Sequence, residues 1–108
     1  TGTALNDVSE TKAFKMALGE NAYKAHISST KGATGHMLGA AGAAEAIATV
    51  LALKHGTVPP TVNLTNPDPA LDLNYTPCKP VKADLTIGIS DSLGFGGHNG
   101  AIAFRKYR

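Results

Sequence analysis

Apolar residues recur at helical spacing near the start of the chain. Between residues 7 and 18 they follow a loosely helical pattern, Asp7 stands where an N-cap belongs, and Glu10 follows three residues later. Gly19 comes directly after the last apolar position, as is typical of a helix end. The pattern therefore predicts a first helix over residues 7–18.

A second stretch, residues 36–55, is apolar on nearly every side and rich in the strong helix formers Ala and Leu. Gly56 follows it and suits the left-handed residue that ends many helices. A helix that is apolar all round belongs in the interior of a protein. The sequence therefore predicts a buried helix over residues 36–55.

Three shorter segments have strand character. Residues 25–30 are β-compatible and run into a Gly-containing turn over residues 31–35. Residues 85–90 and 101–104 are typical of two strands, joined by the glycine-rich segment 91–100. The order helix, strand, helix, strand, strand favours a layered α/β fold and predicts at least one parallel crossover.

Residues 57–80 contain all six prolines of the chain, so regular structure is largely forbidden there. We expect a long ordered connection, of a kind that is often functional in a compact domain. A length of 108 residues, 43% of them hydrophobic, fits one globular unit. A chain of this size often depends on a partner for part of its core.

Charge and cysteine content exclude several classes of function. The formal charge of +2 is far from the dense basic face of a nucleic-acid-binding protein. The single Cys78 excludes an internal disulfide framework and is compatible with a reducing compartment. The longest apolar run, residues 37–53, is shorter than a membrane span, and no targeting segment is visible. We expect neither a nucleic-acid nor a membrane partner.

The richest candidate chemistry lies around the turn after residues 25–30, where Lys31 and His36 occur. A His in the first turn of a buried helix lies at the positive end of the helix dipole, and burial also disfavours its cation. The neutral ring would then donate a hydrogen bond to a developing oxyanion. The alternative is that His36 only satisfies a backbone carbonyl.

Glu45 stands among apolar neighbours in the second predicted helix. A buried carboxylate needs a cation or several hydrogen-bond donors. Lys31 and a bound metal cation are the candidates for its partner, and Glu10 could belong to the same network. The alternative is that Glu45 lies on a narrow exposed stripe of the helix.

The glycines of residues 94–100 superficially resemble a phosphate-binding loop, but a strand follows them where such a loop needs a helix. Two interpretations stay open. One is a tight glycine hairpin, and the other is a loop in which Phe95, between two glycines, swings like a gate beside a ligand. The four histidines and Cys78 lack metal-ligand spacing, and Cys78 is expected to be structural and not a nucleophile.

Five ordered motifs, spread from end to end, belong together: Thr1-Gly2-Thr3 with Asp7 and Glu10, Ser29-Thr30-Lys31 with Thr34-Gly35-His36, Pro59-Pro60-Thr61, Asn66-Pro67-Asp68, and Gly94-Phe95-Gly96-Gly97-His98-Asn99. In these motifs the chain resembles the β-ketoacyl-acyl-carrier-protein synthases, and most of all the type II enzymes of fatty-acid synthesis. The resemblance implies a thiolase-like α/β fold that is layered α/β/α in the complete enzyme. Residues 1–108 would be its C-terminal quarter, with the first catalytic His just before Thr1 and the nucleophilic Cys further upstream.

The resemblance also implies an activity for the complete enzyme. An acyl group is held on the active-site Cys, malonyl-carrier protein loses CO₂, and the resulting carbanion attacks the acyl thioester. Residues 1–108 alone would be inactive. The implied partners are acyl carrier protein, the missing N-terminal part and a second subunit in a homodimer. Catalysis would need no cofactor, although a structural monovalent cation would fit, and the compartment would be the bacterial cytoplasm, a plastid or a mitochondrion.

Site residues are assigned by the same resemblance, residue by residue. His36 would hydrogen-bond the malonyl thioester carbonyl and stabilise the enolate, while Lys31 organises the charge of the active site. The remaining assignments fall into two groups. The pantetheine arm and substrate would meet Thr1, Thr3, the gating Phe95, Gly96 and Gly97, and a structural network or cation would involve Glu10, Glu45, Asp91 and Ser92.

One departure stands out: the family usually has Asn where this chain has Asp91, which adds a negative charge near the proposed cation, and Leu93 replaces a Phe. Three rivals remain. They are a non-catalytic partner subunit similar to chain-length factors, the ketosynthase domain of a modular polyketide assembly, and a separate binding module. The compact end at residues 104–108 favours a stand-alone enzyme over the second. Apolar faces left exposed by missing strands would speak against the third.

Overall fold

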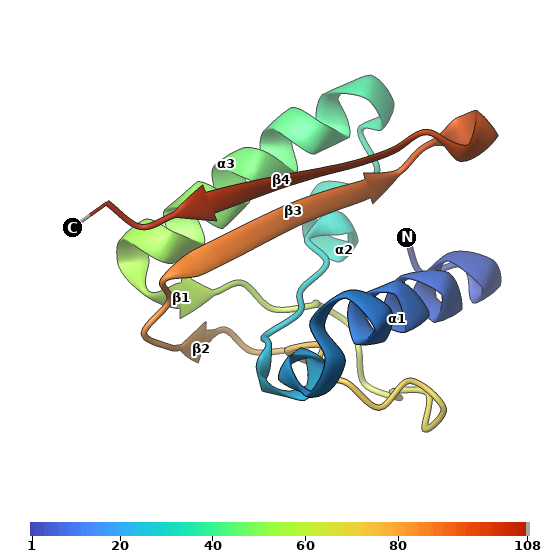
Figure 1. Ribbon diagram of the computed structural model, residues 1–108, viewed down its shortest axis with the longest axis horizontal. Coiled ribbons are helices and arrows are strands. Elements are labelled where there is room, and N and C mark those ends of the chain that lie inside the picture. The colour runs from blue at the N-terminus through green and yellow to red at the C-terminus, as the bar shows by residue number, and fades with distance from the viewer. Residues whose placement is uncertain (108) are drawn as a thin grey trace.

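A computed structural model describes residues 1–107 of the chain, and Figure 1 shows the arrangement of its elements. The helices are α1 (Ala4–Leu18), α2 (Lys31–Thr34) and α3 (Ala41–His55). Short 3₁₀ helices are η1 (Gly19–Lys24), η2 (Leu38–Ala40) and η3 (Phe95–Gly97). The strands are β1 (Thr57–Val58), β2 (Val81–Lys82), β3 (Ile87–Leu93) and β4 (Asn99–Arg105).

The main sheet is the hairpin of β3 and β4. The two strands are antiparallel, with Ile87 opposite Arg105 and Leu93 opposite Asn99. Both predicted strands are confirmed, although β3 extends three residues beyond its predicted end and β4 begins two residues earlier than predicted. α3 lies along one face of this hairpin (Figure 1), so the helix and the sheet form two packed layers.

The predicted parallel crossover is wrong for residues 1–107. Both strand ladders there, β1 with β2 and β3 with β4, are antiparallel. Parallel pairing occurs as an isolated bridge between Thr61 and Pro77. A crossover would need residues 25–30 to join a sheet.

Residues 25–30 are not a strand, which corrects the prediction made from their β-compatible side chains. The Ile27 N–H donates to the carbonyl oxygen of Asn74 at 2.9 Å, and the Ile27 carbonyl accepts from Oγ1 of Thr76 at 2.8 Å. The partner is thus a loop, which satisfies the Ile27 N–H with a backbone carbonyl and the Ile27 carbonyl with a side-chain hydroxyl, where a neighbouring strand would use its backbone for both.

Close approach of α3 to β3 depends on Gly88. A Cβ at this position would lie 2.6 Å from Cγ2 of Thr49 and 3.4 Å from Cδ1 of Leu53. Leu53 is buried on the inner side of α3, and Val58 of β1 is buried as well. The core on this side of the molecule is therefore built around a glycine that leaves room for the helix.

α1 begins at Ala4, with Thr3 as its N-cap residue, so the prediction of Asp7 as N-cap is wrong. Asp7 lies in the first turn, where its carboxylate accepts the Gly2 N–H at 3.2 Å. The chain reverses at Gly2, which has a φ of 71°, and this brings residues before the helix back over its first turn. The predicted end at Gly19, with φ 55°, is confirmed.

α3 begins at Ala41, five residues after the predicted start at residue 36, while its end at the left-handed Gly56 (φ 57°, ψ 42°) is confirmed. The helix is not buried all round, because Ile47 is 61% exposed. Neighbouring Val50 and Leu51 are also exposed and line a shallow apolar hollow with Phe104. The expectation that these residues expose apolar faces is confirmed.

The proline-rich connection over residues 57–80 is ordered by threonine hydroxyls, and β1 is its only described strand. Oγ1 of Thr11 in α1 lies 2.7 Å from the Tyr75 hydroxyl. Oγ1 of Thr61 accepts the Ser29 N–H at 3.1 Å and donates to the Tyr75 carbonyl at 2.7 Å. These bonds join the connection to α1 and to the segment that leads into α2.

Among the helices of residues 1–107, none combines the length and the apolar character that a membrane crossing requires.

Candidate functional site

Lys31 and Glu45 form an ion pair between α2 and α3. Nζ of Lys31 donates to Oε1 of Glu45, and the two side chains are only 19% and 15% exposed. Lys31 is the first residue of α2. A Cβ at Gly32 would lie 2.8 Å from Cγ2 of Val62, so glycine lets this short helix approach the proline-rich connection closely. Of the two candidate partners for Glu45, a Lys31 ammonium and a metal cation, the structure shows Lys31, and the alternative of an exposed stripe is wrong.

His36 lies between α2 and η2, outside any helix, so the prediction that it starts the second helix is wrong. The side chain is exposed, and the first residue of α3 is Ala41. Gly35 interrupts the helical backbone because it adopts φ 78°, which places His36 on a separate short loop. The His36 ring therefore has neither the helix N-terminus nor the burial that the sequence predicts.

A different feature controls the tautomer of His36. The Leu38 N–H donates to Nδ1 of His36 at 3.1 Å. An accepting Nδ1 carries no proton, so a neutral ring must carry its proton on Nε2. Leu38 adopts φ 50°, a left-handed conformation that is unfavourable for Leu. The backbone thus leaves Nε2 as a hydrogen-bond donor.

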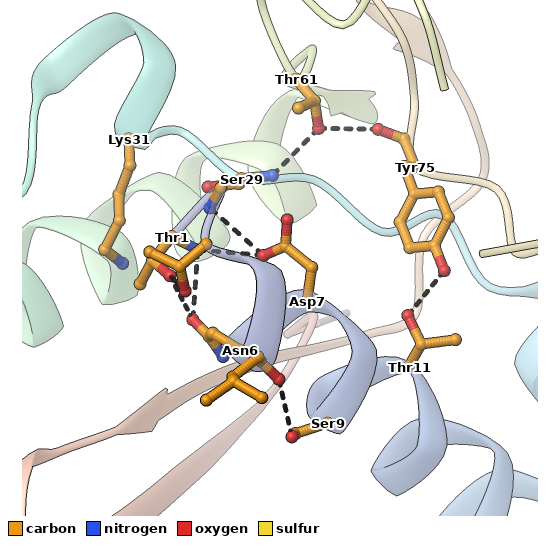
Figure 2. Close-up of polar contacts among 12 residues, drawn as sticks. Thr1, Asn6, Asp7, Ser9, Thr11, Ser29, Lys31, Thr61 and Tyr75 are labelled. Atoms are coloured by element: carbon orange, nitrogen blue, oxygen red, sulfur yellow. Dashed lines mark hydrogen bonds and ion pairs between the residues drawn. The ribbon is translucent and has the colours of Figure 1, made fainter. Parts of the chain in front are cut away.

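The residues before α1 form a compact polar turn, shown in Figure 2. Oγ1 of Thr1 donates to Oδ1 of Asn6 at 2.6 Å and lies 2.8 Å from Oγ1 of Thr3. Both threonines are exposed, and the Lys31 side chain points from α2 toward Thr1 in Figure 2.

Phe95 lies at the tip of the β3–β4 hairpin and is 91% exposed. Gly96 and Gly97 follow it with φ of 74° and 80°, a backbone that only glycine adopts without strain. The Gly94 N–H closes the turn on the His98 carbonyl at 2.6 Å. The tight glycine hairpin is confirmed, and the gating role of Phe95 stays a prediction.

Glu10 of α1 and Asp91 of β3 place two carboxyl groups close to each other. Partial burial raises the pKa of Glu10 above its ordinary 4.5, and the Asp91 carboxylate raises it further through like charge and a hydrogen bond. In residues 1–107, Glu10, Glu45 and Asp91 do not form a group of three that could hold a metal ion. Glu10 therefore does not join the Lys31–Glu45 pair in a common metal-binding cluster.

Two remaining predictions concern Ser92 and Cys78. Ser92 lies in β3 opposite Gly100, one residue after Asp91. Cys78 is exposed, and its Sγ donates to the Leu64 carbonyl at 3.2 Å. Among residues 1–107, neither side chain bonds to Lys31 or His36, the two candidate catalytic residues.

Two residues at the site were missed by sequence reasoning. Asn6 carried a usable signal, because Asn near a helix start commonly bonds neighbouring backbone or side-chain groups. Leu38 carried none, since a left-handed backbone at Leu is contrary to its intrinsic preference. Among residues 1–107, no hydrogen bond or ion pair joins His36 directly to Lys31 or Glu45.

Comparison with known families decides the assignment. Residues 1–65 match the family described as beta-ketoacyl synthase, C-terminal domain. The chain belongs to the β-ketoacyl synthase family. Its thiolase-like fold and the predicted resemblance are thereby confirmed, and the motifs around Lys31 and His36 lie inside the matched range.

Curated relatives extend the similarity over the whole chain. A 3-oxoacyl-[acyl-carrier-protein] synthase 2 of Synechocystis is 52% identical over 108 residues, and that of Vibrio harveyi is 50% identical over 107 residues. The match covers 100% and 98% of this chain, but only 26% of each relative. The chain thus spans about a quarter of the length of these β-ketoacyl synthases.

Solved structures agree with the sequence matches. A type II polyketide synthase acyl-carrier protein in complex with its ketosynthase bound to the hexaketide contains a chain that is 39% identical, with a TM-score of 0.94. The ishigamide ketosynthase/chain length factor gives 36% identity and a TM-score of 0.93. The matches cover 98% and 100% of this chain and 26% of each solved chain. This β-ketoacyl synthase segment therefore has the fold of the corresponding ketosynthase quarter.

Proposed function

We propose that residues 1–108 form the C-terminal part of a β-ketoacyl-acyl-carrier-protein synthase of fatty-acid elongation. The single observation that carries the proposal is the hydrogen bond from the Leu38 N–H to Nδ1 of His36. It makes Nε2 of the neutral ring a donor, which is what a developing enolate oxygen requires. Identity of 52% with a 3-oxoacyl-[acyl-carrier-protein] synthase 2 supports the same reaction.

The proposed reaction has two bond changes at the malonyl group. The bond to its carboxylate breaks, CO₂ leaves, and the electron pair becomes the enolate of the remaining thioester, whose oxygen accepts a hydrogen bond from Nε2 of His36. The enolate carbon then attacks the acyl thioester carbonyl, forms the new carbon–carbon bond and expels the cysteine thiolate. The nucleophilic cysteine comes from outside these 108 residues.

Lys31 supports this chemistry through charge. Its ammonium is paired with Glu45 in a largely buried position. The pair has no net charge, and its dipole sets the electrostatic field next to the His36 loop. We assign Thr1 and Thr3 to the pantetheine arm, because both hydroxyls are exposed at the turn before α1. Phe95, with Gly96 and Gly97, is assigned to gating because it projects from a hairpin tip.

Acyl carrier protein is the proposed donor of both substrates, since the ketosynthase of one solved structure is in complex with an acyl-carrier protein. A homodimer and a cytoplasmic or organellar location belong to the same proposal. For a structural monovalent cation, the acids do not fit as one shared site, because Glu45 is taken by Lys31 and Glu10 faces Asp91. No step of the reaction depends on such an ion.

The test uses the complete synthase that contains this chain. In His36→Ala, we expect kcat for condensation to fall by about 100-fold to 1000-fold, as for other oxyanion donors. Transfer of the acyl group from acyl-carrier protein onto the enzyme should persist. His55→Ala is the matched control, because His55 lies at the far end of α3 and is exposed. Normal condensation by His36→Ala would refute the proposal.

A polyketide ketosynthase is the second candidate, and the 39% identity to a type II polyketide ketosynthase is the observation that favours it. The higher identity to fatty-acid-type synthases makes elongation the first choice. A chain-length-factor-like subunit would lack condensing activity altogether. The same assay, run with saturated acyl and with polyketide primers, separates the three.

A further inference from the structure

The side chain of Asn74 bonds to Thr76 at one end and to His26 at the other, and the two ends can be told apart. The Thr76 N–H donates at 3.1 Å, so the amide atom that accepts it must be Oδ1. The other amide atom, Nδ2, lies 3.1 Å from Nδ1 of His26. Because an amide nitrogen only donates, Nδ1 of His26 is the acceptor and carries no proton. The two hydrogen bonds of Asn74 therefore require a neutral His26.

Protonation of His26 is incompatible with this arrangement. A cationic imidazole has an N–H at both nitrogens, so Nδ1 would face the amide nitrogen of Asn74 with donor against donor. Rotation of the amide by half a turn would offer Oδ1 to the cation, but it would place Nδ2 against the Thr76 N–H. One of the two bonds is lost in either case. Imidazole takes up its proton between roughly pH 8 and pH 5, so this loss falls in an accessible range.

Thr76 depends on its surroundings for its conformation. It is fully buried and adopts φ 48°, a left-handed backbone that is unfavourable for a β-branched residue. Besides the bond to Asn74, its Oγ1 donates to the Ile27 carbonyl at 2.8 Å and its carbonyl accepts the Thr61 N–H at 2.8 Å. A strained residue persists only while its neighbours hold it, so loss of the bond to Asn74 should loosen this turn.

The turn at Thr76 anchors the segment that leads to Lys31. Its hydroxyl holds the backbone of Ile27 directly. Its carbonyl holds Thr61, whose Oγ1 accepts the Ser29 N–H at 3.1 Å. Ser29 lies two residues before Lys31, the first residue of α2. A change at Thr76 is therefore transmitted to residues 27–31.

Few charged or titratable groups lie on the segments that flank His26 and Asn74. In residues 19–24 and 72–76 they are Glu20, Tyr23, Lys24, Asp72 and Tyr75. Asp72 already accepts from Nζ of Lys15 and from the Tyr23 hydroxyl, and the Tyr75 hydroxyl bonds to Thr11. Among residues 1–107, no ion pair includes His26. The bond from Asn74 is thus the contact that protonation of the ring disturbs.

We propose that the His26–Asn74 hydrogen bond is a pH-sensitive switch for the segment that carries Lys31. While His26 is neutral, Asn74 holds the N–H of Thr76, and residues 27–31 are anchored to the proline-rich connection. When the ring takes up a proton, Thr76 or His26 loses its bond to Asn74 and the segment loosens. The switch does not depend on which reaction the complete synthase catalyses.

The test is amide hydrogen exchange of the complete synthase at pH 8 and pH 5, expressed as protection factors so that the intrinsic pH dependence of exchange is removed. In the wild type, we expect protection of the Thr76 and Ile27 amides to fall about tenfold at pH 5, the worth of one hydrogen bond. The exchange rates of the two amides are read without any substrate.

Two variants separate the switch from a general effect of acid. In His26→Asn, the new side-chain oxygen replaces Nδ1 and accepts from Asn74 at either pH, so protection should stay high at both. In Asn74→Asp, one carboxylate oxygen accepts the Thr76 N–H and the other pairs with the protonated ring. Protection in this variant should therefore be higher at pH 5 than at pH 8, the reverse of the wild type.

His55→Asn is the matched control, because His55 is exposed at the end of α3, and it should show the wild-type fall. Three results would each overturn the inference. They are wild-type protection that is the same at both pH values, an equal fall in His26→Asn, and a fall in place of the rise in Asn74→Asp.

Discussion

The Leu38 N–H donates to Nδ1 of His36 at 3.1 Å, and Leu38 itself has a positive φ of 50°. Such a conformation costs roughly 1–2 kcal/mol for a residue with a Cβ. Because Leu38 is 68% exposed, little burial of its side chain compensates for this cost. The residue that donates to His36 is thus also a strained residue of the loop before α3.

We predict that Leu38→Gly keeps activity and that Leu38→Val loses it. Gly adopts the left-handed backbone without strain and retains the N–H, so the free energy of unfolding should rise by about 0.5–1 kcal/mol. Val disfavours the conformation, so the loop between Gly35 and Ala41 must change its path, and we expect the contact with His36 to be lost and kcat to fall at least about tenfold. Denaturant unfolding and steady-state assays of the complete synthase measure both. Equal kcat for the two variants would contradict the prediction.

The Lys31–Glu45 pair should be costly to break from one side. In Glu45→Gln, a largely buried ammonium loses its counter-charge, and we expect a loss of about 3 kcal/mol in the free energy of unfolding. The double variant Lys31→Met with Glu45→Leu should be more stable than either single variant. A double-mutant cycle gives the coupling, and additive losses would show that the pair does not interact.

The Glu10–Asp91 contact predicts a pH-dependent stability. A carboxyl group whose folded-state pKa is raised favours folding below its ordinary 4.5 and loses that contribution as pH rises through the raised pKa. Asp91→Asn removes the like charge and should bring the pKa of Glu10 down. The variant should therefore be more stable than the wild type at pH 7 and little different from it at pH 4. Urea unfolding at both pH values is the measurement, and an equal gain at both would exclude this origin.

Replacing Gly88 should create a steric clash that a second substitution relieves. Ala at this position would bring its Cβ within 2.6 Å of Cγ2 of Thr49, and we expect a loss of about 1–3 kcal/mol. Thr49→Ser removes that methyl group but keeps the hydroxyl that bonds the Glu45 carbonyl at 2.9 Å. Gly88→Ala with Thr49→Ser should recover most of the loss. Failure of the rescue would locate the strain at Leu53 instead.

Local signals in the sequence were sufficient for several features. Gly19 and Gly56 end their helices with the backbone that only glycine adopts easily, and the glycines after Phe95 make the hairpin turn. Glu45 among apolar residues required a cation, and Lys31 supplies it. These features depend on one residue and its own physical chemistry.

Other features depend on partners that are distant in sequence. Residues 25–30 have β-compatible side chains, but Ile27 meets a loop and not a strand. α3 begins later than the apolar pattern predicts, because Gly35 and the left-handed Leu38 divert the chain between His36 and Ala41. An apolar pattern does not contain that information, since the backbone angles are set by the loop as a whole.

The hydrogen bonds by which threonine hydroxyls hold the proline-rich connection differ in kind from the Lys31–Glu45 ion pair. Thr11, Thr61 and Thr76 bond uncharged oxygen and nitrogen atoms, whose interactions are not screened by dissolved ions. Charge–charge attraction weakens as ionic strength shortens its range, although burial limits that effect for Lys31 and Glu45. Added salt should therefore leave the threonine hydrogen bonds beneath α2 intact and should weaken the Lys31–Glu45 attraction only slightly, so both the anchoring of the proline-rich connection and the charge beside the His36 loop persist at high ionic strength.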